Sequence, residues 1–289
     1  MPIDLHQRLS EFSYGYGVTR EVEQLLASIG VRSTPFLPSL LNEKKLGFDV
    51  KFDKPGAAIL LQFKLGEVLQ RFRRTNLSVP APKLRKPFWR ISVDTAEPNG
   101  QYDLLLKAEK AGAEFYYVAP RFTAWDRYAS LFQRGRVLQR SILLPSSRID
   151  SKLKAKGEPD GWHRVVYDRS RIHVLSEPQE VEATTPEALA SAIRARIEQR
   201  EQGLGEVLRH VYGSLESRRE IRRAEGEEAP DAESAPELAS SPSRLASDCR
   251  GRLERFRGIA EREEDAVFAA LGVEAWAAGS QLIAATLEG

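Results

Sequence analysis

Two apolar-rich segments joined by a turn occupy residues 47–64, which read GFDVKFDKPGAAILLQFK. Apolar and polar side chains alternate through residues 47–52, and this period of two predicts a β-strand with one buried face. Residues 53–56 have the composition of a tight turn. Residues 57–64 predict a second strand, close enough in sequence for the two strands to pair as a β-hairpin.

The predicted hairpin assigns its side chains to two faces, because successive residues of a strand point to opposite sides of a sheet. With the turn at residues 53–56, Phe52 faces Ala57 and Asp49 faces Leu60. One face is then entirely apolar, and we expect it to be core. The opposite face gathers an acid, an amide and two lysines, namely Asp49, Lys51, Gln62 and Lys64.

This polar face suits the hydrolysis of phosphodiester bonds with Mg²⁺ or Mn²⁺ as cofactor. Mg²⁺ prefers oxygen ligands, and the candidate ligands are the carboxylate of Asp49, the amide oxygen of Gln62 and the backbone carbonyl of Phe63. Lys64 can orient or help to deprotonate an attacking water and stabilise charge on the phosphate. One acid neutralises Mg²⁺ poorly, so a second carboxylate is expected nearby. The candidates are Glu43, Glu21 and Glu23.

The pattern Gly47-Phe48-Asp49, a short turn, then Leu61-Gln62-Phe63-Lys64 resembles the restriction-endonuclease-like PD-(D/E)XK nucleases. Its closest match is the Mrr-like branch, in which a glutamine replaces the second acid. The resemblance covers residues 19–119, where the predicted order of helix, three strands, helix and strand is that of the family core. It implies that Asp49 binds the metal, that Gln62 and Lys64 complete the catalytic motif, and that Glu21 or Glu23 is the helix glutamate. The chain departs from the family by lacking a proline before Asp49 and by a long connection between helix and strand, so Glu43 is an alternative for that glutamate.

The resemblance implies a Mg²⁺-dependent endonuclease that acts on nucleic acid, with DNA favoured over RNA, and by analogy with the family it suggests a role in bacterial defence against foreign DNA. An alternative is a catalytically degenerate nuclease fold that binds nucleic acid or a protein. The neutral Gln62 motivates this alternative, because a missing carboxylate weakens metal binding. A third hypothesis is a toxin or accessory subunit that acts through the C-terminal helices.

The remaining sequence predicts an α/β (α+β) protein, with a mixed sheet flanked by helices and a mostly helical C-terminal part. Helices are expected at residues 19–29, 102–111, 124–133 and 250–271, the last ended by Gly272 and followed by one more turn. Strands are also expected at residues 88–93, 114–119, 137–144, 164–167 and 172–175. The predicted parts are a nuclease domain (1–180), a helical extension (186–223), a disordered linker (224–248) and a C-terminal helical segment (249–289).

Charge is distributed unevenly along the chain, although the formal net charge is only +2. Residues 1–160 contain 26 Lys+Arg against 17 Asp+Glu, whereas residues 161–289 contain 17 against 24. This asymmetry predicts an anionic partner for the first half. Basic residues interleaved with aromatic ones follow Lys64, a composition that suits contacts with phosphates and unpaired bases. The predicted nucleic-acid-binding residues are Arg71, Arg73, Arg74, Lys83, Arg85, Lys86 and Arg90.

Composition also excludes several classes of protein. The one cysteine, Cys249, excludes an internal disulfide and a multi-cysteine zinc site. Apolar stretches are far shorter than the ~20 residues that cross a bilayer, and the N-terminus lacks a signal-peptide pattern. We therefore expect a soluble cytoplasmic protein with no membrane contact. The apolar stripe of the last predicted helix can mediate homo-oligomerisation or bind a partner protein.

Overall fold

The apolar run that follows the predicted turn forms strand β2, Gly56–Phe63, in the computed structural model. All of its residues are buried, as in a strand with both faces covered. The structure describes residues 9–37, 46–72, 81–95, 101–157, 161–175, 178–224 and 249–288. The strand predicted at residues 57–64 is confirmed, because β2 covers residues 56–63.

Contacts along the chain define two compact units, and each unit is built from three separate stretches. Unit 1 comprises Met1–Val31, Leu61–Leu106 and Phe115–Arg194. Unit 2 comprises Arg32–Leu60, Lys107–Glu114 and Ala195–Gly289. Unit 2 thus combines parts of the predicted nuclease domain with residues 195–223 of the predicted helical extension and with the predicted C-terminal segment.

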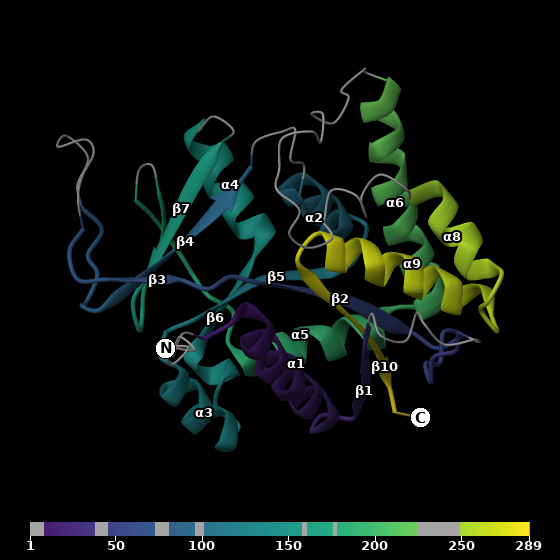
Figure 1. Ribbon diagram of the computed structural model, residues 1–289, viewed down its shortest axis with the longest axis horizontal. Coiled ribbons are helices and arrows are strands. Elements are labelled where there is room, and N and C mark those ends of the chain that lie inside the picture. Colours follow the sequence, from purple (N-terminus) through teal and green to yellow (C-terminus); the bar gives the residue numbers. More distant parts are fainter. Residues whose placement is uncertain are drawn as a thin grey trace, which may run out of the picture. The chain divides into compact units, whose positions relative to one another are not determined.

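Unit 1 contains a five-stranded antiparallel sheet with the order β3-β4-β7-β8-β9. Figure 1 shows β4 and β7 side by side, and in their register Ile91 lies opposite Val165. Helix α4, Ser146–Lys156, packs against β8 and β9. The strands are β3 Glu67–Leu69, β4 Phe88–Asp94, β7 Trp162–Tyr167, β8 Ile172–Leu175 and β9 Gln179–Val181.

A second, mixed sheet has the strand order β1-β10-β2-β5-β6. In unit 1, β5 pairs with β6 antiparallel, with Val118 opposite Leu143. The chain is thus of mixed α and β class, with helices flanking its sheets and a helical C-terminal part. The other elements of this region are β5 Glu114–Pro120, β6 Ser141–Pro145, α2 Gln101–Lys110, α3 Trp125–Gln133 and the 3₁₀ helix η2 Leu138–Arg140.

Local sequence signals predicted many of these elements correctly. The helices α2 and α3 and the strands β4, β5, β7 and β8 agree with the predicted ranges to within two residues. The strand expected at residues 137–144 is instead divided between η2 and β6.

Helix α1, Glu11–Ala27, begins well before the predicted start at residue 19. Ser10 caps it by accepting a hydrogen bond from the backbone N–H of Ser13. Two glycines lie within its first turns because neighbouring aromatic rings leave no room for a side chain. A Cβ at Gly15 would lie 2.7 Å from the ring of Phe63, and a Cβ at Gly17 would lie 2.9 Å from the hydroxyl of Tyr128.

In unit 2, strand β10 lies between β1 and the first part of β2. The turn expected after residue 272 is therefore wrong, because the chain there enters a buried strand. The single helix expected at residues 250–271 is also wrong, because two helices occupy this region. Gly272 does not end the second helix but lies inside it, where a Cβ would be 2.3 Å from the ring of Phe36. The elements of unit 2 are β1 Val31–Pro35, β10 Ser280–Leu287, α6 Leu204–Ala224, α8 Cys249–Arg257 and α9 Glu263–Ala277. Helix α5, Pro186–Gln199, lies mostly in unit 1.

The first strand of the predicted hairpin is wrong, since residues 47–51 form no strand and the neighbours of β2 are β10 and β5. Burial still alternates as the sequence predicts, with Phe48 and Val50 buried. Side chains of α9 bind this backbone in place of a paired strand. Asp265 accepts from the Phe48 N–H at 3.0 Å, and Arg262 donates to the carbonyl groups of Phe48 at 2.6 Å and Val50 at 3.1 Å.

The predicted linker lies almost wholly outside the described residues, which resume at Cys249. None of the helices that the structure describes is long and apolar enough to cross a membrane.

Candidate active site

Lys64 directly follows β2, and the backbone there is held beside β5. Its N–H donates to the carbonyl of Val118 at 3.0 Å. The preceding residue, Phe63, turns its ring towards α1, where it meets the ring of Tyr14 edge-on at a centroid distance of 5.9 Å. Sequence and packing thus fix the backbone from which the Lys64 side chain extends.

Two carboxylates of unit 1 lie close enough to act electrostatically on Lys64. Burial lowers the pKa of Lys64 below its ordinary value, and the negative charges of Glu11 and Asp94 partly offset this effect. We call Lys64, Glu11 and Asp94 the Lys64 cluster. A half-buried lysine with two acidic neighbours has a more accessible neutral form than a surface lysine, while the ammonium form retains partners of opposite charge.

Glu11 enters the cluster from the first turn of α1. Loss of hydration raises the pKa of its carboxyl group, and the charge of Lys64 acts in the opposite direction. A carboxylate in the first turn is also favoured by the helix dipole. The prediction missed this residue because it placed the start of α1 after the two glycines. The N-cap Ser10 followed by an acid was the signal that could have found it.

Asp94 comes from the last position of β4. Tyr117 on β5 lies near Asp94. Burial is the larger of the two causes that raise the pKa of the Tyr117 hydroxyl, and the negative charge of Asp94 is the smaller one. The sequence placed a strand end here but gave no reason to select this acid. Its proximity to Lys64 arises only from tertiary structure.

Gln62 precedes Lys64 by two residues on β2 and is only 1% exposed. The open polar face expected for the predicted hairpin is therefore wrong at this position, because both faces of β2 are covered. The Phe63 side chain is buried against α1, and the metal-binding role of its backbone carbonyl stays a prediction.

Asp49 does not join the Lys64 cluster through a hairpin. It lies in unit 2, where its carboxylate pairs with Arg32 and its side chain is 86% exposed. The predicted register, which placed Asp49 opposite Leu60, is wrong because no strand forms at residue 49.

Glu21 has a structural position in the core of unit 1. Its two carboxylate oxygens accept hydrogen bonds from the N–H groups of Val137 at 2.9 Å and Leu138 at 2.8 Å, so that it caps η2. Because both carboxylate oxygens are engaged and the residue is 7% exposed, Glu21 is no longer a candidate metal ligand.

Glu23 is half-buried, and burial raises its pKa. Glu43 lies outside the described residues.

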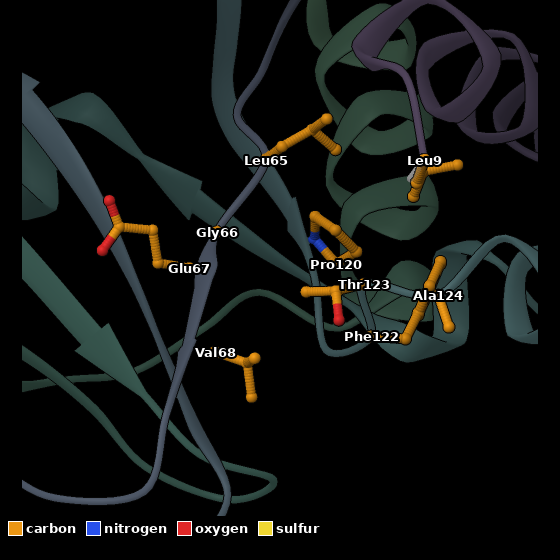
Figure 2. A pocket seen from close by; sticks show the side chains of 9 residues that line it. All are labelled: Leu9, Leu65, Gly66, Glu67, Val68, Pro120, Phe122, Thr123 and Ala124. Carbon is orange, nitrogen blue, oxygen red and sulfur yellow. The ribbon is translucent and has the colours of Figure 1, made fainter. Parts of the chain in front are cut away.

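A pocket of about 560 Å³ begins directly after Lys64 in sequence. Figure 2 shows Leu65 and Val68 on one side of it and Leu9, Pro120 and Ala124 on the other. The Glu67 carboxylate points away from the other labelled side chains, and it pairs with Arg90. The lining residues are Leu9, Leu65, Gly66, Glu67, Val68, Pro120, Phe122, Thr123 and Ala124.

Gly66 brings the pocket wall close to the sheet of unit 1. A Cβ at this position would lie 2.7 Å from the hydroxyl of Tyr167, which in turn donates to the carbonyl of Pro120 at 2.9 Å. The apolar wall and the volume are typical of a small-ligand site.

The structure describes five of the seven predicted nucleic-acid-binding residues. Arg71, Lys83, Arg85 and Lys86 are exposed, whereas Arg90 is half-buried. Arg73 and Arg74 lie outside the described residues.

Asp168 fixes the backbone of this basic segment by accepting from the N–H of Arg85 at 2.7 Å. Burial raises the pKa of Asp168, but the N–H groups of Arg85, Ser170 and Arg171 outweigh it, so the net pKa is lowered.

The donor chemistry of the Lys64 cluster fits a magnesium ion. Mg²⁺ is commonly bound by one or two carboxylates together with substrate phosphate and water, and Glu11 and Asp94 supply two carboxylates. Within the described ranges, no group of three or more His, Cys, Asp or Glu side chains is arranged to hold a metal. Glu11 and Asp94 are the two carboxylates that act on Lys64 in unit 1.

No protein-family model, no curated protein and no solved structure matches this chain.

Proposed function

We propose that the protein is a Mg²⁺- or Mn²⁺-dependent nuclease whose reaction takes place at the Lys64 cluster. The observation that carries the proposal is a half-buried lysine that follows Gln62 by two residues and has the carboxylates of Glu11 and Asp94 as neighbours. This set retains the Gln-x-Lys part of the motif on which the family resemblance rests. It replaces the predicted Asp49 with two acids that the fold brings to Lys64.

Each residue has a distinct task in this proposal. The ammonium group of Lys64 pairs with a phosphate oxygen and stabilises the negative charge that develops during hydrolysis. Because burial lowers the pKa of Lys64, its neutral amine is more accessible than that of a surface lysine, and this form, as an alternative to the ammonium role, can accept a proton from the attacking water. Glu11 and Asp94 would hold the ion, which when bound supplies Lewis-acid activation of water and phosphate.

The substrate class follows from charge and from the resemblance. The exposed basic side chains around β4 favour a polyanion, and their phosphate contacts would give affinity without sequence choice. The resemblance favours DNA over RNA and a role in bacterial defence against foreign DNA.

The test is cleavage of labelled DNA and RNA by purified protein with Mg²⁺ or Mn²⁺. Lys64→Ala should lower the rate by roughly 100-fold or more, the effect of removing a charge-stabilising or proton-transferring group. Lys154→Ala is the matched control, because it removes an exposed lysine of the same unit that pairs with Asp150 on α4. Circular dichroism confirms that both variants are folded, and unchanged activity in folded Lys64→Ala would refute the proposal.

Asp49→Asn decides between the motif-based and the structure-based assignment of the acids. We expect this variant to keep its activity and Asp94→Asn to lose it. The opposite result would restore Asp49 as the metal ligand.

Metal binding separates the enzyme from the catalytically degenerate alternative, which the neutral Gln62 motivates. Calorimetric titration with Mn²⁺ should show binding that Asp94→Asn weakens. Nucleic-acid binding with no Mn²⁺ binding and no cleavage would favour the binding module.

A further inference from the structure

Helix α1 carries an exposed aromatic face beginning one residue after Glu11. Phe12 and Tyr16 are 87% and 60% exposed, and Arg20 is also exposed. Their spacing of four residues places all three side chains on one side of the helix. The opposite side is core, with Tyr14, Val18 and Val22 buried in α1.

Helix α3 extends this face within unit 1. The rings of Tyr16 and Phe132 lie 5.8 Å apart, and the guanidinium of Arg20 lies 4.6 Å from the centre of the Phe132 ring. Trp125, at the start of α3, is 42% exposed. We call Phe12, Tyr16, Arg20, Trp125 and Phe132 the aromatic surface.

The aromatic surface is adjacent in sequence to residues of the pocket wall and of the Lys64 cluster. Phe12 is bonded to Glu11 of the cluster, and Trp125 is bonded to Ala124 of the pocket wall. Figure 2 shows Leu9 and Ala124 on the same side of the pocket. The same two segments, residues 9–20 and 124–132, therefore supply the aromatic surface, one carboxylate of the cluster and part of the pocket wall.

We propose that the aromatic surface binds the unpaired bases of single-stranded nucleic acid, and that single strands are the preferred substrate. This inference rests on the proposed function. Unpaired bases expose π-faces that stack on aromatic side chains, whereas a duplex hides them within its own stack. Arg20, together with exposed Arg127, Arg134 and Arg136 on and after α3, supplies positive charge for the phosphates. The pocket, whose volume is within the ~300–1,000 Å³ of small-ligand sites, accepts one unstacked nucleotide.

The test is fluorescence anisotropy with a labelled single strand and the matching duplex, in EDTA so that no cleavage occurs. An oligonucleotide of about 20 nucleotides exceeds the ~4–16-nucleotide footprint of common single-strand-binding domains. We expect tighter binding of the single strand. Phe12→Ala, Tyr16→Ala and Trp125→Ala should each weaken it by about 5- to 150-fold, the usual effect of removing one stacking partner.

Two controls separate stacking from general damage. Tyr16→Phe keeps the ring and should bind like the unmodified protein. Trp276→Ala removes a tryptophan that is 52% exposed on α9 of unit 2, and it should also leave binding unchanged. Equal affinity for the two DNA forms, or unchanged binding in the three aromatic variants, would overturn the inference.

The outcomes for binding and for catalysis are independent. Lys64→Ala should fail to cleave the single strand but should still bind it more tightly than the duplex, because the aromatic surface is intact. If no preparation cleaves DNA or RNA but binding depends on Phe12 and Tyr16, the nuclease proposal fails and the single-strand site stands. If cleavage requires Lys64 but is equal on duplex and single strand, the nuclease stands and the single-strand site fails.

Discussion

Single glycines determine how close the elements of unit 1 approach one another. Gly15 faces the ring of Phe63, the residue immediately before Lys64, so the geometry of the candidate site depends on a missing side chain on α1. Glycine weakens an isolated helix by ~1 kcal/mol relative to alanine. Tertiary packing therefore outweighs local preference at the start of α1.

Gly15→Ala should lower the free energy of unfolding by about 1–2 kcal/mol, because overpacking costs ~1–3 kcal/mol and helix propensity returns part of it. Gly213→Ala is the control, since a Cβ at Gly213 on α6 would meet no atom within 4 Å. That variant should gain about 0.5–1 kcal/mol. Urea unfolding measures both, and equal stabilisation of the two variants would contradict the packing argument.

The His173 imidazole on β8 is another residue whose environment has a measurable consequence. It is 7% exposed, and neither ring nitrogen has a hydrogen-bond partner among the residues that the structure describes. Burial is the largest cause of the lowered pKa of His173. The negative charges of Glu180 and Asp168 raise this pKa, whereas the positive charge of Arg171 lowers it further. The neutral form is therefore favoured in the folded protein.

Because the pKa of His173 is lower in the folded than in the unfolded state, protonation favours unfolding. Its contribution to stability is complete above the ordinary histidine pKa of ~6.5 and decreases as the pH falls below it. The unmodified protein should lose more stability than His173→Leu between about pH 7.5 and pH 5.5. Urea midpoints at the two pH values test this, and identical pH dependence in both proteins would exclude the effect.

At the scale of elements, the segment before β2 shows how an extended chain can be stabilised without becoming a strand. Arg262, the N-cap of α9, and Asp265 in its first turn satisfy backbone groups of Phe48 and Val50, and Asp265 is 0% exposed. Asp265 also accepts from Arg262 at 2.8 Å and 2.9 Å. Two side chains from a distant helix thus replace the ladder of a hairpin.

Asp265→Ala should destabilise the protein by about 3 kcal/mol, because it leaves a buried backbone N–H and a guanidinium without their partner. Glu264→Ala is the matched control on the same helix. Its ion pair with Arg209 is partly exposed and should contribute less than ~1 kcal/mol. Thermal or urea unfolding measures the difference, and similar losses in the two variants would show that Asp265 has no special role.

These elements also show what the sequence could predict. Turns and apolar runs predicted β2, β4, α2 and β5 because their signals are local. The partner of β2 could not be predicted in this way, because β10 comes from residues 280–287, far away in sequence. Alternating burial at residues 47–52 also does not distinguish a paired strand from an extended segment whose backbone is bound by side chains. The Gln-x-Lys motif identified Lys64, but Glu11 and Asp94 converge on it only through packing.

At the scale of the whole molecule, each unit draws on stretches that are far apart in sequence. Unit 2 depends on β10, where Leu282, Ile283 and Ala285 are 0% exposed and β1 lies on one side and β2 on the other. The C-terminal residues are therefore part of a core rather than an addition to it.

Truncation after Gly279 should unfold unit 2, because it removes the strand between β1 and β2. Limited proteolysis should then cut readily within residues 195–279 of the truncated chain. Truncation after Leu287 keeps β10 and serves as the control, which should remain resistant. Equal resistance of both truncated proteins would show that β10 is dispensable.

The late position of β10 has a consequence for biosynthesis. A ribosome adds residues 64–280 after β2 has been made, which takes roughly 10–40 s at ~5–20 residues per second. Once β2 has left the exit tunnel, it lacks β10 for the rest of this time, and an unpaired strand edge readily joins another chain. Nascent chains should therefore need a chaperone until β10 has emerged, and unit 2 should fold only after that point.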